Sequence, residues 1–523
     1  MSDGGQQGKV WKSMQKNLLE YLEKTVQRVP DKPAYVNERE SLTFREVSDR
    51  SKAIGSFLGR QGHSREPVVI FMRKSPYTVT AFFGTLYAGC FYVPIDEEMP
   101  AHRIELIFEN LNPRAMICDA QTIRSAKDMP YKGNIYLYEE ICREPEDRKL
   151  LGDIRRNALD IDPVYIVFTS GSTGVPKGVA ACHRSVIDYI EQLSKVLHFS
   201  EETVFGNQSP FYFDACLKEL YPTAKFGATT YIIPKELFSF PVKLVDFLNQ
   251  YKINTVCWVV SALTMISGFG VFETKKPEYL HTIAFGSEVF PVRQFNLWKD
   301  ALPDTSFVNL YGPTEATGMS CYYRADRKFE PDEVIPVGRP FDNTQILLLK
   351  EDQTLAAEGE EGEICIRGTA VTLGYYNDFK RTGEAFVQNP LNTSYPDIIY
   401  RTGDIGKYNQ EGELMFVSRR DYQIKHMGHR IELGEIEACA ARMEGIRSVC
   451  CIYQKEQEKI ILFYTGELER GDVIARLKEA LPRYMVPNRV RRLEIMPLTP
   501  NGKLDRVSLE RDYIQQIKTK KGE

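Results

Sequence analysis

The sequence predicts an α/β protein with a large N-terminal domain of layered α/β subdomains, a β-barrel-like subdomain, and a small α+β domain at the C-terminal end. Three observations lead to this prediction. Short apolar runs alternate with longer amphipathic stretches, a pattern typical of strands and helices that build mainly parallel sheets. From about Ile335 the pattern changes to strands of a smaller sheet or barrel, and after Arg420 the chain resembles a separate unit.

The apolar runs of the N-terminal domain are the expected core strands, because strands covered on both faces are continuously apolar. They are Pro67–Met72, Ala115–Cys118, Tyr165–Phe168, Thr230–Pro234 and Thr255–Val260. The barrel-like strands are expected at Gly362–Gly368 and Glu413–Val417.

The C-terminal unit is expected to contain two helices and two strands, and its last residues are expected to fray. We divide the chain into residues 1–420 and 421–523. In the second part the helices are Leu433–Met443 and Asp472–Leu481, the strands are Ser448–Tyr453 and Ile460–Tyr464, and the fraying end is Gln515–Glu523.

Composition excludes several classes of protein. A chain of 523 residues exceeds one compact core. A net charge of −4 gives no indication of nucleic-acid binding. No apolar run reaches the length of a membrane span, and the N-terminus has no secretory signal. The 11 scattered cysteines show no metal-binding spacing, so we expect reduced thiols and a cytoplasmic protein. The oligomeric state stays open, with a monomer expected.

A loop of small residues after the run Tyr165–Phe168 is the most informative feature. Glycines let the backbone turn its N–H groups toward an anion, the hydroxyls add donors, and the lysine adds a charge. This combination suits a polyphosphate, although its spacing is not that of a Walker A loop. The residues concerned are Thr169, Ser170, Gly171, Ser172, Thr173, Gly174 and Lys177.

The loop resembles the phosphate loop of the adenylate-forming superfamily, which includes acyl-CoA synthetases, luciferases and adenylation domains of nonribosomal peptide synthetases. Further motifs of that superfamily follow in order along nearly the whole chain. They are Leu42–Glu46, Leu86–Asp96, Asn309–Glu315, Tyr400–Asp404, Arg419–Lys425 and Pro500–Arg506. One departure is Ser418, where the family usually has glycine.

The resemblance implies ATP and Mg²⁺ as cofactors and gives each motif a role. Thr314 holds a phosphate oxygen, and Glu315 is the magnesium ligand because Mg²⁺ prefers hard oxygen ligands. Tyr311 stacks on adenine, Asp404 binds both ribose hydroxyls, and Arg419 supports the ribose or phosphate. The same resemblance places four more residues beside the nucleotide: Gly286, Ser287, Asn309 and Gly312.

The C-terminal unit is expected to move. In the family, a lysine corresponding to Lys503 bridges the carboxylate and the α-phosphate during adenylation, and Asp421 matches the hinge residue. After rotation, Lys425 and the loop His426–Arg430 are expected to line the approach of a thiol.

The segment Phe211–Glu219 indicates which acid is activated. Amino-acid-activating domains carry Phe-Asp here, and Phe213 and Asp214 match it. Asp214 is expected to pair with the substrate ammonium, since a buried carboxylate needs a cationic partner. A helix N-cap is the alternative role for Asp214. The other expected pocket residues are Ala215, Lys218, Trp258, Ile283, Phe285, Leu310, Gly318 and Met319.

Two features of the expected pocket bear on substrate size and charge. The large side chains of Trp258 and Phe285 would shorten it and favour a small substrate. Lys218 either pairs a substrate carboxylate or extends outward beside Glu219, and the sequence leaves both open.

Only 20 residues follow Lys503, which leaves no room for a carrier domain. The chain therefore resembles free-standing ligases such as D-alanine–carrier-protein ligase, and the expected acceptor is the phosphopantetheine thiol of a separate carrier protein. An acyl- or aryl-CoA ligase is the alternative, and a non-catalytic ATP-binding regulator is a third.

Overall fold

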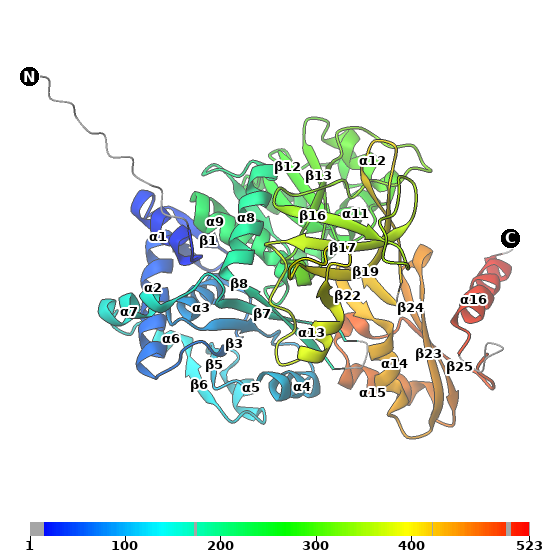
Figure 1. The fold of residues 1–523 in the computed structure, drawn as a ribbon, viewed down its shortest axis with the longest axis horizontal. Coiled ribbons are helices and arrows are strands. Elements are labelled where there is room, and N and C mark those ends of the chain that lie inside the picture. Colours follow the sequence, from blue (N-terminus) through cyan, green and yellow to red (C-terminus); the bar gives the residue numbers. More distant parts are fainter. Residues whose placement is uncertain (1–14, 172–174, 421, 498–503, 522–523) are drawn as a thin grey trace, which may run out of the picture.

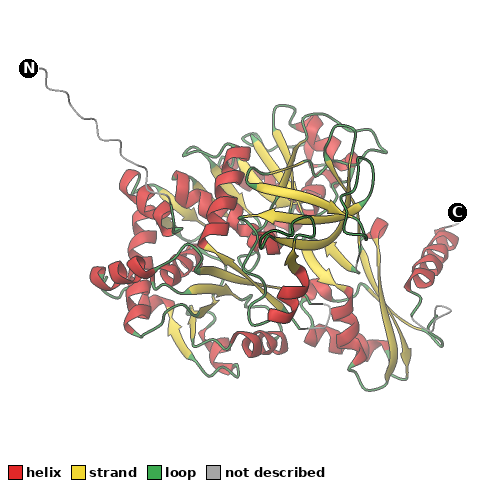
Figure 2. Cartoon of the chain, in the orientation of Figure 1, coloured by secondary structure: helices red, strands yellow, loops and turns green. Residues whose placement is uncertain are grey.

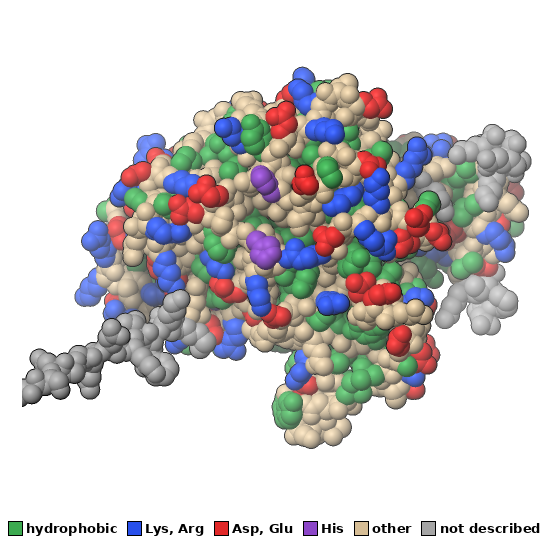
Figure 3. Space-filling model, turned by 90° about the horizontal axis from the view of Figure 1, so that it is seen from above, with side chains coloured by type: hydrophobic (Ala, Val, Ile, Leu, Met, Phe, Trp, Pro, Cys, Tyr) green, Lys and Arg blue, Asp and Glu red, His purple; other side chains and the backbone are tan. Residues whose placement is uncertain are grey.

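The computed structural model describes residues 15–171, 175–420, 422–497 and 504–521. Figures 1 and 2 show a mixed α/β molecule in which the first helix and the last helix lie at opposite ends. On the face drawn in Figure 3, Lys and Arg side chains are interspersed with Asp and Glu side chains. No helix in the described ranges is long and apolar enough to cross a membrane.

Two large sheets form the N-terminal part. The first has six strands, and β3 to β7 are parallel while β8 returns antiparallel to β7. In spatial order its strands are β6 (Asn134–Leu137), β5 (Ala115–Cys118), β3 (Pro67–Phe71), β4 (Phe91–Pro94), β7 (Pro163–Thr169) and β8 (Lys177–Cys182).

The second sheet has nine strands, parallel in its centre and antiparallel at both ends. In spatial order they are β15 (Arg339–Pro340), β14 (Cys321–Arg324), β13 (Ser306–Tyr311), β12 (Thr282–Gly286), β11 (Thr255–Val259), β9 (Val204–Asn207), β10 (Thr229–Ile232), β1 (Pro33–Val36) and β2 (Ser41–Thr43).

Helices form three layers around these sheets. The middle layer packs between the sheets in one continuous apolar core, and contains α1 (Leu19–Arg28), α2 (Phe44–Arg60), α3 (Pro76–Tyr87), α8 (His183–Leu197) and α9 (Leu217–Phe226). The outer face of the six-stranded sheet is covered by α4 (Ala101–Leu111) and α5 (Ile123–Asp128). The outer face of the nine-stranded sheet is covered by α10 (Pro241–Gln250), α11 (Val260–Gly268) and α12 (Val292–Ala301).

A five-stranded antiparallel sheet follows, as the sequence predicts. Its strands are β16 (Thr344–Leu349), β17 (Gly362–Gly368), β18 (Phe386–Gln388), β19 (Ile398–Tyr408) and β20 (Leu414–Arg419). The remaining helices of this half of the molecule are α6 (Tyr138–Ile141), α7 (Arg148–Asn157) and α13 (Phe379–Ala385).

We call residues 422–521 the C-terminal unit. It has an apolar core of its own on each face of a three-stranded sheet. The sheet contains β23 (Ile446–Gln454), β24 (Lys459–Gly466) and β25 (Arg489–Arg492), and is packed by α14 (Leu433–Ala441), α15 (Arg470–Ala480) and α16 (Arg506–Lys521). A hairpin of β21 (Gln423–His426) and β22 (His429–Glu432) precedes them.

One prediction about this unit is wrong. The expected fraying end from Gln515 is helical as far as Lys521. Leu509 and Tyr513 anchor α16 in the core under β23 and β24, and a helix nucleated by tertiary packing propagates through polar residues.

Candidate active site

The predicted motifs converge on a cavity of about 140 Å³ between the two large sheets, the five-stranded sheet and the β21–β22 hairpin. The parallel strands end at this place, which is where ligands bind in open α/β folds. The predicted residues that line the cavity are Thr169, Ser170, Phe213, Asp214, Ala215, Ser287, Gly312, Thr314, Gly318, Met319, Asp404, Arg419 and Lys425.

The phosphate loop begins where β7 ends at Thr169 and closes where β8 begins at Lys177. The buried hydroxyl of Thr169 has no hydrogen-bond partner among the described atoms. A Cβ atom on Gly171 would lie 2.1 Å from the carbonyl oxygen of Val175, so only glycine permits this turn. Ser172, Thr173 and Gly174 lie outside the described residues.

The predicted ribose ligand is held rigidly. Oδ2 of Asp404 accepts a hydrogen bond from the hydroxyl of Tyr311 at 2.6 Å, and Oδ1 accepts one from Arg419 at 2.5 Å. The ammonium of Lys425 lies 5.8 Å from the centre of the Tyr311 ring. In this arrangement Lys425 therefore occupies the face of Tyr311 on which adenine is expected.

Asp214 lies at the cavity wall and does not cap a helix. It is the first residue of a short 3₁₀ helix (Asp214–Cys216), and neither that helix nor α9 has a side-chain cap. Burial raises the pKa of its carboxyl group, which Lys218 and a hydrogen bond with Thr314 oppose. The N-cap alternative is therefore wrong, and the carboxylate is available to a ligand.

Lys218 does not extend into solvent, because only 5% of its surface is exposed. Its charge acts on two buried carboxyl groups and lowers the pKa of both Asp214 and Glu219. Lys218 is therefore a buried counter-charge beside the cavity, although it does not line the cavity itself.

The structure does not bring Trp258, Ile283 and Phe285 to the cavity. They pack with α10 to α12 on the outer face of the nine-stranded sheet, and Trp258 donates a hydrogen bond to the carbonyl of Gly206. Alternate residues of a strand point to opposite faces, so their neighbours Cys257 and Ala284 face the middle layer with Leu310. The expected shortening of the pocket by Trp258 and Phe285 is absent from this arrangement.

Glu315 is fully buried and both of its oxygens are engaged. Oε1 accepts a hydrogen bond from the hydroxyl of Tyr375 at 2.8 Å and lies 3.4 Å from the ammonium of Lys177, while Oε2 accepts one from Arg430 at 2.6 Å. Burial works to raise the pKa of Glu315, but the charges of Arg430 and Lys177 hold it well below the usual range. This arrangement does not fit a metal ligand.

The β21–β22 hairpin enters the site through a tight turn. Met427 and Gly428 both have positive φ angles, +51° and +80°, as a two-residue hairpin turn requires. The amide of Gly428 donates a hydrogen bond to Glu288 at 2.6 Å. His429 stacks on Tyr484 with ring centres 3.8 Å apart. The hairpin thus lies where the sequence predicts the approach of a thiol.

Several site residues were not predicted from the sequence. Tyr375, Glu288, Tyr484 and Glu435 belong to no recognised motif, and each contacts the site across a long sequence separation. The only available signal was the position of Arg430 at the end of the predicted thiol loop. Asn309 donates a hydrogen bond to the carbonyl of Pro336 at 2.8 Å and does not line the cavity.

Two predicted residues with central roles, Asp421 and Lys503, lie outside the described residues. The hinge and the adenylation lysine therefore stay predictions. Gly286 ends β12 at the site, although it does not line the cavity.

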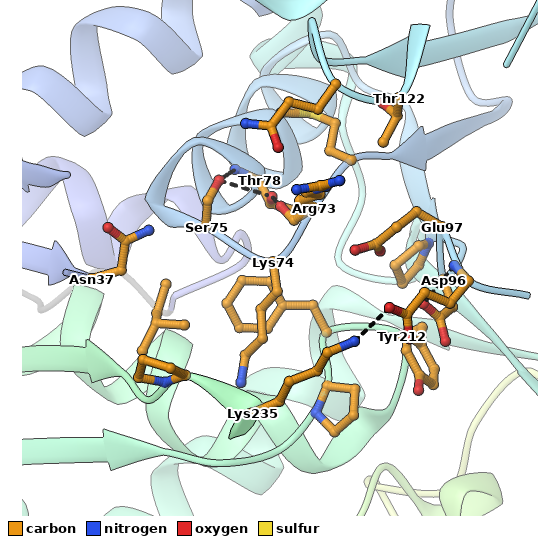
Figure 4. Close-up of a pocket in the computed structure, with 18 of the residues that line it drawn as sticks. Asn37, Arg73, Lys74, Ser75, Thr78, Asp96, Glu97, Thr122, Tyr212 and Lys235 are labelled. Carbon is orange, nitrogen blue, oxygen red and sulfur yellow. Dashed lines mark hydrogen bonds and ion pairs between the residues drawn. The ribbon is translucent and has the colours of Figure 1, made fainter. Parts of the chain in front are cut away.

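The largest cavity is a different one, with a volume of about 650 Å³ (Figure 4). It lies across the segment Gln208–Phe213 from the site and is lined by side chains of both charges, including Lys74, Asp96 and Lys235. Burial lowers the pKa of Lys74 to about 8. None of the predicted site residues lines this cavity, so we place the active site in the smaller one.

Curated relatives are similar over nearly the whole chain. Zwittermicin A synthase ZmaJ of Bacillus cereus is 31% identical over 505 residues, with 94% of each chain covered. Tyrocidine synthase 1 of Brevibacillus parabrevis is 29% identical over 94% of this chain, which spans only 45% of that protein.

Solved structures share the fold. The Vibrio cholerae adenylation domain AlmE, in complex with glycyl-adenosine-5′-phosphate, has a TM-score of 0.83 at 21% identity, with 96% of this chain and 98% of that chain covered. The o-succinylbenzoate-CoA synthetase MenE of Bacillus subtilis has a TM-score of 0.81 at 18% identity, with 95% and 98% covered.

The family comparison agrees with the geometry of the site. Residues 22–376 match the family described as AMP-binding enzyme. That range contains the phosphate loop, Asp214, Tyr311 and Glu315. The chain belongs to the AMP-binding enzyme family of adenylate-forming ligases.

Proposed function

We propose that this enzyme activates an amino acid as an aminoacyl-AMP, with ATP and Mg²⁺, and transfers it to the phosphopantetheine thiol of a separate carrier protein. Asp214 carries the proposal for an amino acid. Its carboxyl group lies at the wall of the same cavity as Thr314 and Asp404. A carboxylate at this place gives a substrate ammonium its partner, whereas an acid without an amine would leave it unpaired.

The relatives support the same class of substrate. The names of two curated relatives are those of peptide-antibiotic synthases, and the AlmE structure contains a glycyl adenylate. Two solved neighbours contain both adenylation and carrier (PCP) domains. These relatives support an acceptor of the carrier-protein type for this chain.

The position of the C-terminal unit supports a two-step cycle. The β21–β22 hairpin fills the side of the cavity next to Asp404 and Arg419, as expected for the thiol-transfer step. We propose that residues 421–523 rotate about Asp421 and bring Lys503 to the α-phosphate for the first step. The cytoplasm is the proposed compartment, because all 11 cysteines are free thiols.

Amino-acid-dependent exchange between ATP and pyrophosphate tests the first half of this proposal. Each amino acid of a panel, including D- and non-proteinogenic ones, is offered with MgCl₂, and at least one is expected to drive exchange. The same panel includes fatty and aryl acids, and exchange with these alone would overturn the assignment.

A CoA ligase is the second candidate, favoured by the fold similarity to MenE. The discriminating measurement offers the adenylate either free CoA or a phosphopantetheinylated carrier and follows thioester formation. Our proposal expects the carrier to be acylated at the higher kcat/KM.

A further inference from the structure

Two charged residues of the C-terminal unit reach the predicted metal ligand and the phosphate loop. Arg430, on β22, donates a hydrogen bond to Glu315 at 2.6 Å. Glu435, on α14, accepts one from the amide of Gly171 at 3.3 Å. A cation therefore lies at the predicted magnesium ligand, and an anion lies at the amide expected to bind phosphate.

The place of Arg430 is incompatible with a metal at Glu315. The carboxylate is 0% exposed, and the other oxygen is shared by Tyr375 and Lys177. A divalent cation at Oε2 would meet the guanidinium at close range, and the repulsion between unlike sites of equal sign is strong in a buried environment. Metal binding at Glu315 requires Arg430 to leave.

The place of Glu435 is equally incompatible with a phosphate at Gly171. Glu435 is only 2% exposed, and its second oxygen forms a buried ion pair with Arg103 of α4. Backbone amides in a glycine-rich loop bind anions, and here the bound anion is this carboxylate. A phosphate at the same amide would be repelled by Glu435.

Ser170 fixes the two contacts in one geometry. Its hydroxyl donates a hydrogen bond to the carbonyl of Arg430 at 2.8 Å and accepts one from the amide of Glu432 at 3.2 Å. The phosphate loop is thus bound to the C-terminal unit at two successive residues, Ser170 and Gly171, beside the Arg430–Glu315 pair.

We propose that Arg430 and Glu435 are an internal substitute for magnesium pyrophosphate. The guanidinium occupies the cation position at Glu315, and the carboxylate occupies a phosphate position at Gly171. The C-terminal unit docks in this pose only after metal and pyrophosphate have left the site. This inference rests on the proposed function, since it assigns Glu315 and the loop to that reaction.

The substitution couples product release to domain movement. Because coupling between two sites is reciprocal, magnesium pyrophosphate must weaken docking by the same factor by which docking weakens its binding. Departure of pyrophosphate then favours the pose in which the hairpin faces the adenylate, and a returning pyrophosphate opposes it.

Hydrogen–deuterium exchange of the full-length enzyme tests this competition. Exchange of the hairpin amides 423–432 is followed with MgCl₂ and sodium pyrophosphate added together, while calorimetry measures their binding. The expected result is a loss of hairpin protection of about tenfold or more at saturation, since charge-assisted hydrogen bonds are broken.

Two variants and a matched control complete the test. Arg430→Met and Glu435→Gln are each expected to lower hairpin protection before any addition and to bind magnesium pyrophosphate more tightly. The control is Arg447→Met, because Arg447 forms an exposed ion pair with Glu467 on the same unit. Its protection and affinity are expected to match those of the wild type.

Unchanged hairpin protection at saturating magnesium pyrophosphate would overturn the inference, and so would the absence of any calorimetric binding. Neither outcome affects the proposed function, which pyrophosphate exchange by the wild-type enzyme decides separately. If Arg430→Met fails to fold, Glu435→Gln and the wild-type titration still give the answer.

Discussion

The hydroxyl of Tyr311 donates a hydrogen bond to Oδ2 of Asp404, with the two oxygens 2.6 Å apart. Tyr311 ends β13 of the nine-stranded sheet, and Asp404 lies on β19 of the five-stranded sheet. The bond therefore joins two parts of the fold at the predicted nucleotide site. With Arg419 on Oδ1, it fixes the carboxylate while leaving each oxygen a further lone pair for a ribose hydroxyl.

Tyr311→Phe keeps the ring and removes this bond. We expect the KM for ATP to rise about 10- to 100-fold, because a hydrogen bond to a charged group contributes about 1.5–3 kcal/mol. The KM for the amino acid is expected to change little. ATP–pyrophosphate exchange at varied ATP measures the effect, with Tyr464→Phe in the C-terminal unit as the control. Equal KM values for ATP would show that the bond does not orient Asp404.

Asp214→Ala tests the ammonium site. Loss of one partner of a buried charge pair costs about 3–5 kcal/mol, equivalent to about two to four decades in kcat/KM for the amino acid. The KM for ATP is expected to stay within about threefold. Exchange is measured with the amino acid and with its desamino analogue. If the variant discriminates between these two ligands as well as the wild type does, Asp214 does not bind the ammonium.

The pKa of Asp214 predicts the acid limb of the pH profile. Burial raises this pKa above the usual 3.8, and only the ionised carboxylate can pair with an ammonium. The kcat/KM for the amino acid is therefore expected to fall, as pH decreases, at a higher pH than an exposed aspartate would give. Pyrophosphate exchange at low amino-acid concentration measures the limb.

Lys218→Met is expected to move that limb to still higher pH. The charge of Lys218 lowers the pKa of Asp214, so its removal raises the pKa further. Lys225→Met, on the same helix, is the matched control because Lys225 pairs with the partly exposed Glu191. An acid limb that moves to lower pH, or coincides with the control, would contradict the role of Lys218.

Lys503→Ala tests the predicted division between half-reactions. We expect adenylation to slow by about 10²–10⁴-fold, because a cation near the α-phosphate is lost. Thioester formation from preformed aminoacyl-AMP is expected to be largely retained. Single-turnover assays of each step make the comparison, and an equal loss in both would remove Lys503 from its assigned role.

Strands covered on both faces could be predicted well from the sequence. Ala115–Cys118 and Gly362–Gly368 have the predicted bounds, because burial on both faces leaves a continuous apolar run. The same property hid which face of β11 and β12 meets the site. Trp258 and Cys257 are equally apolar, and only the position of the helices shows that Trp258 packs outside.

Contacts across long sequence separations could not be predicted. Arg430 and Glu315 are 115 residues apart, and Glu435 and Gly171 are 264 apart. Each residue alone resembles a solvated charge, and the pairing depends on how the C-terminal unit docks. The phosphate loop and Asp214 were predicted because their motifs are local in the sequence.

Direct detection of the intermediate tests the central claim most sharply. The enzyme is incubated with ATP, MgCl₂ and a mixture of amino acids and other carboxylic acids at equal concentrations, and the enzyme-bound adenylate is identified by mass spectrometry. The account predicts an aminoacyl-AMP that Asp214→Ala fails to accumulate. An adenylate of an acid without an α-amino group, formed equally by the wild type and the variant, would contradict it.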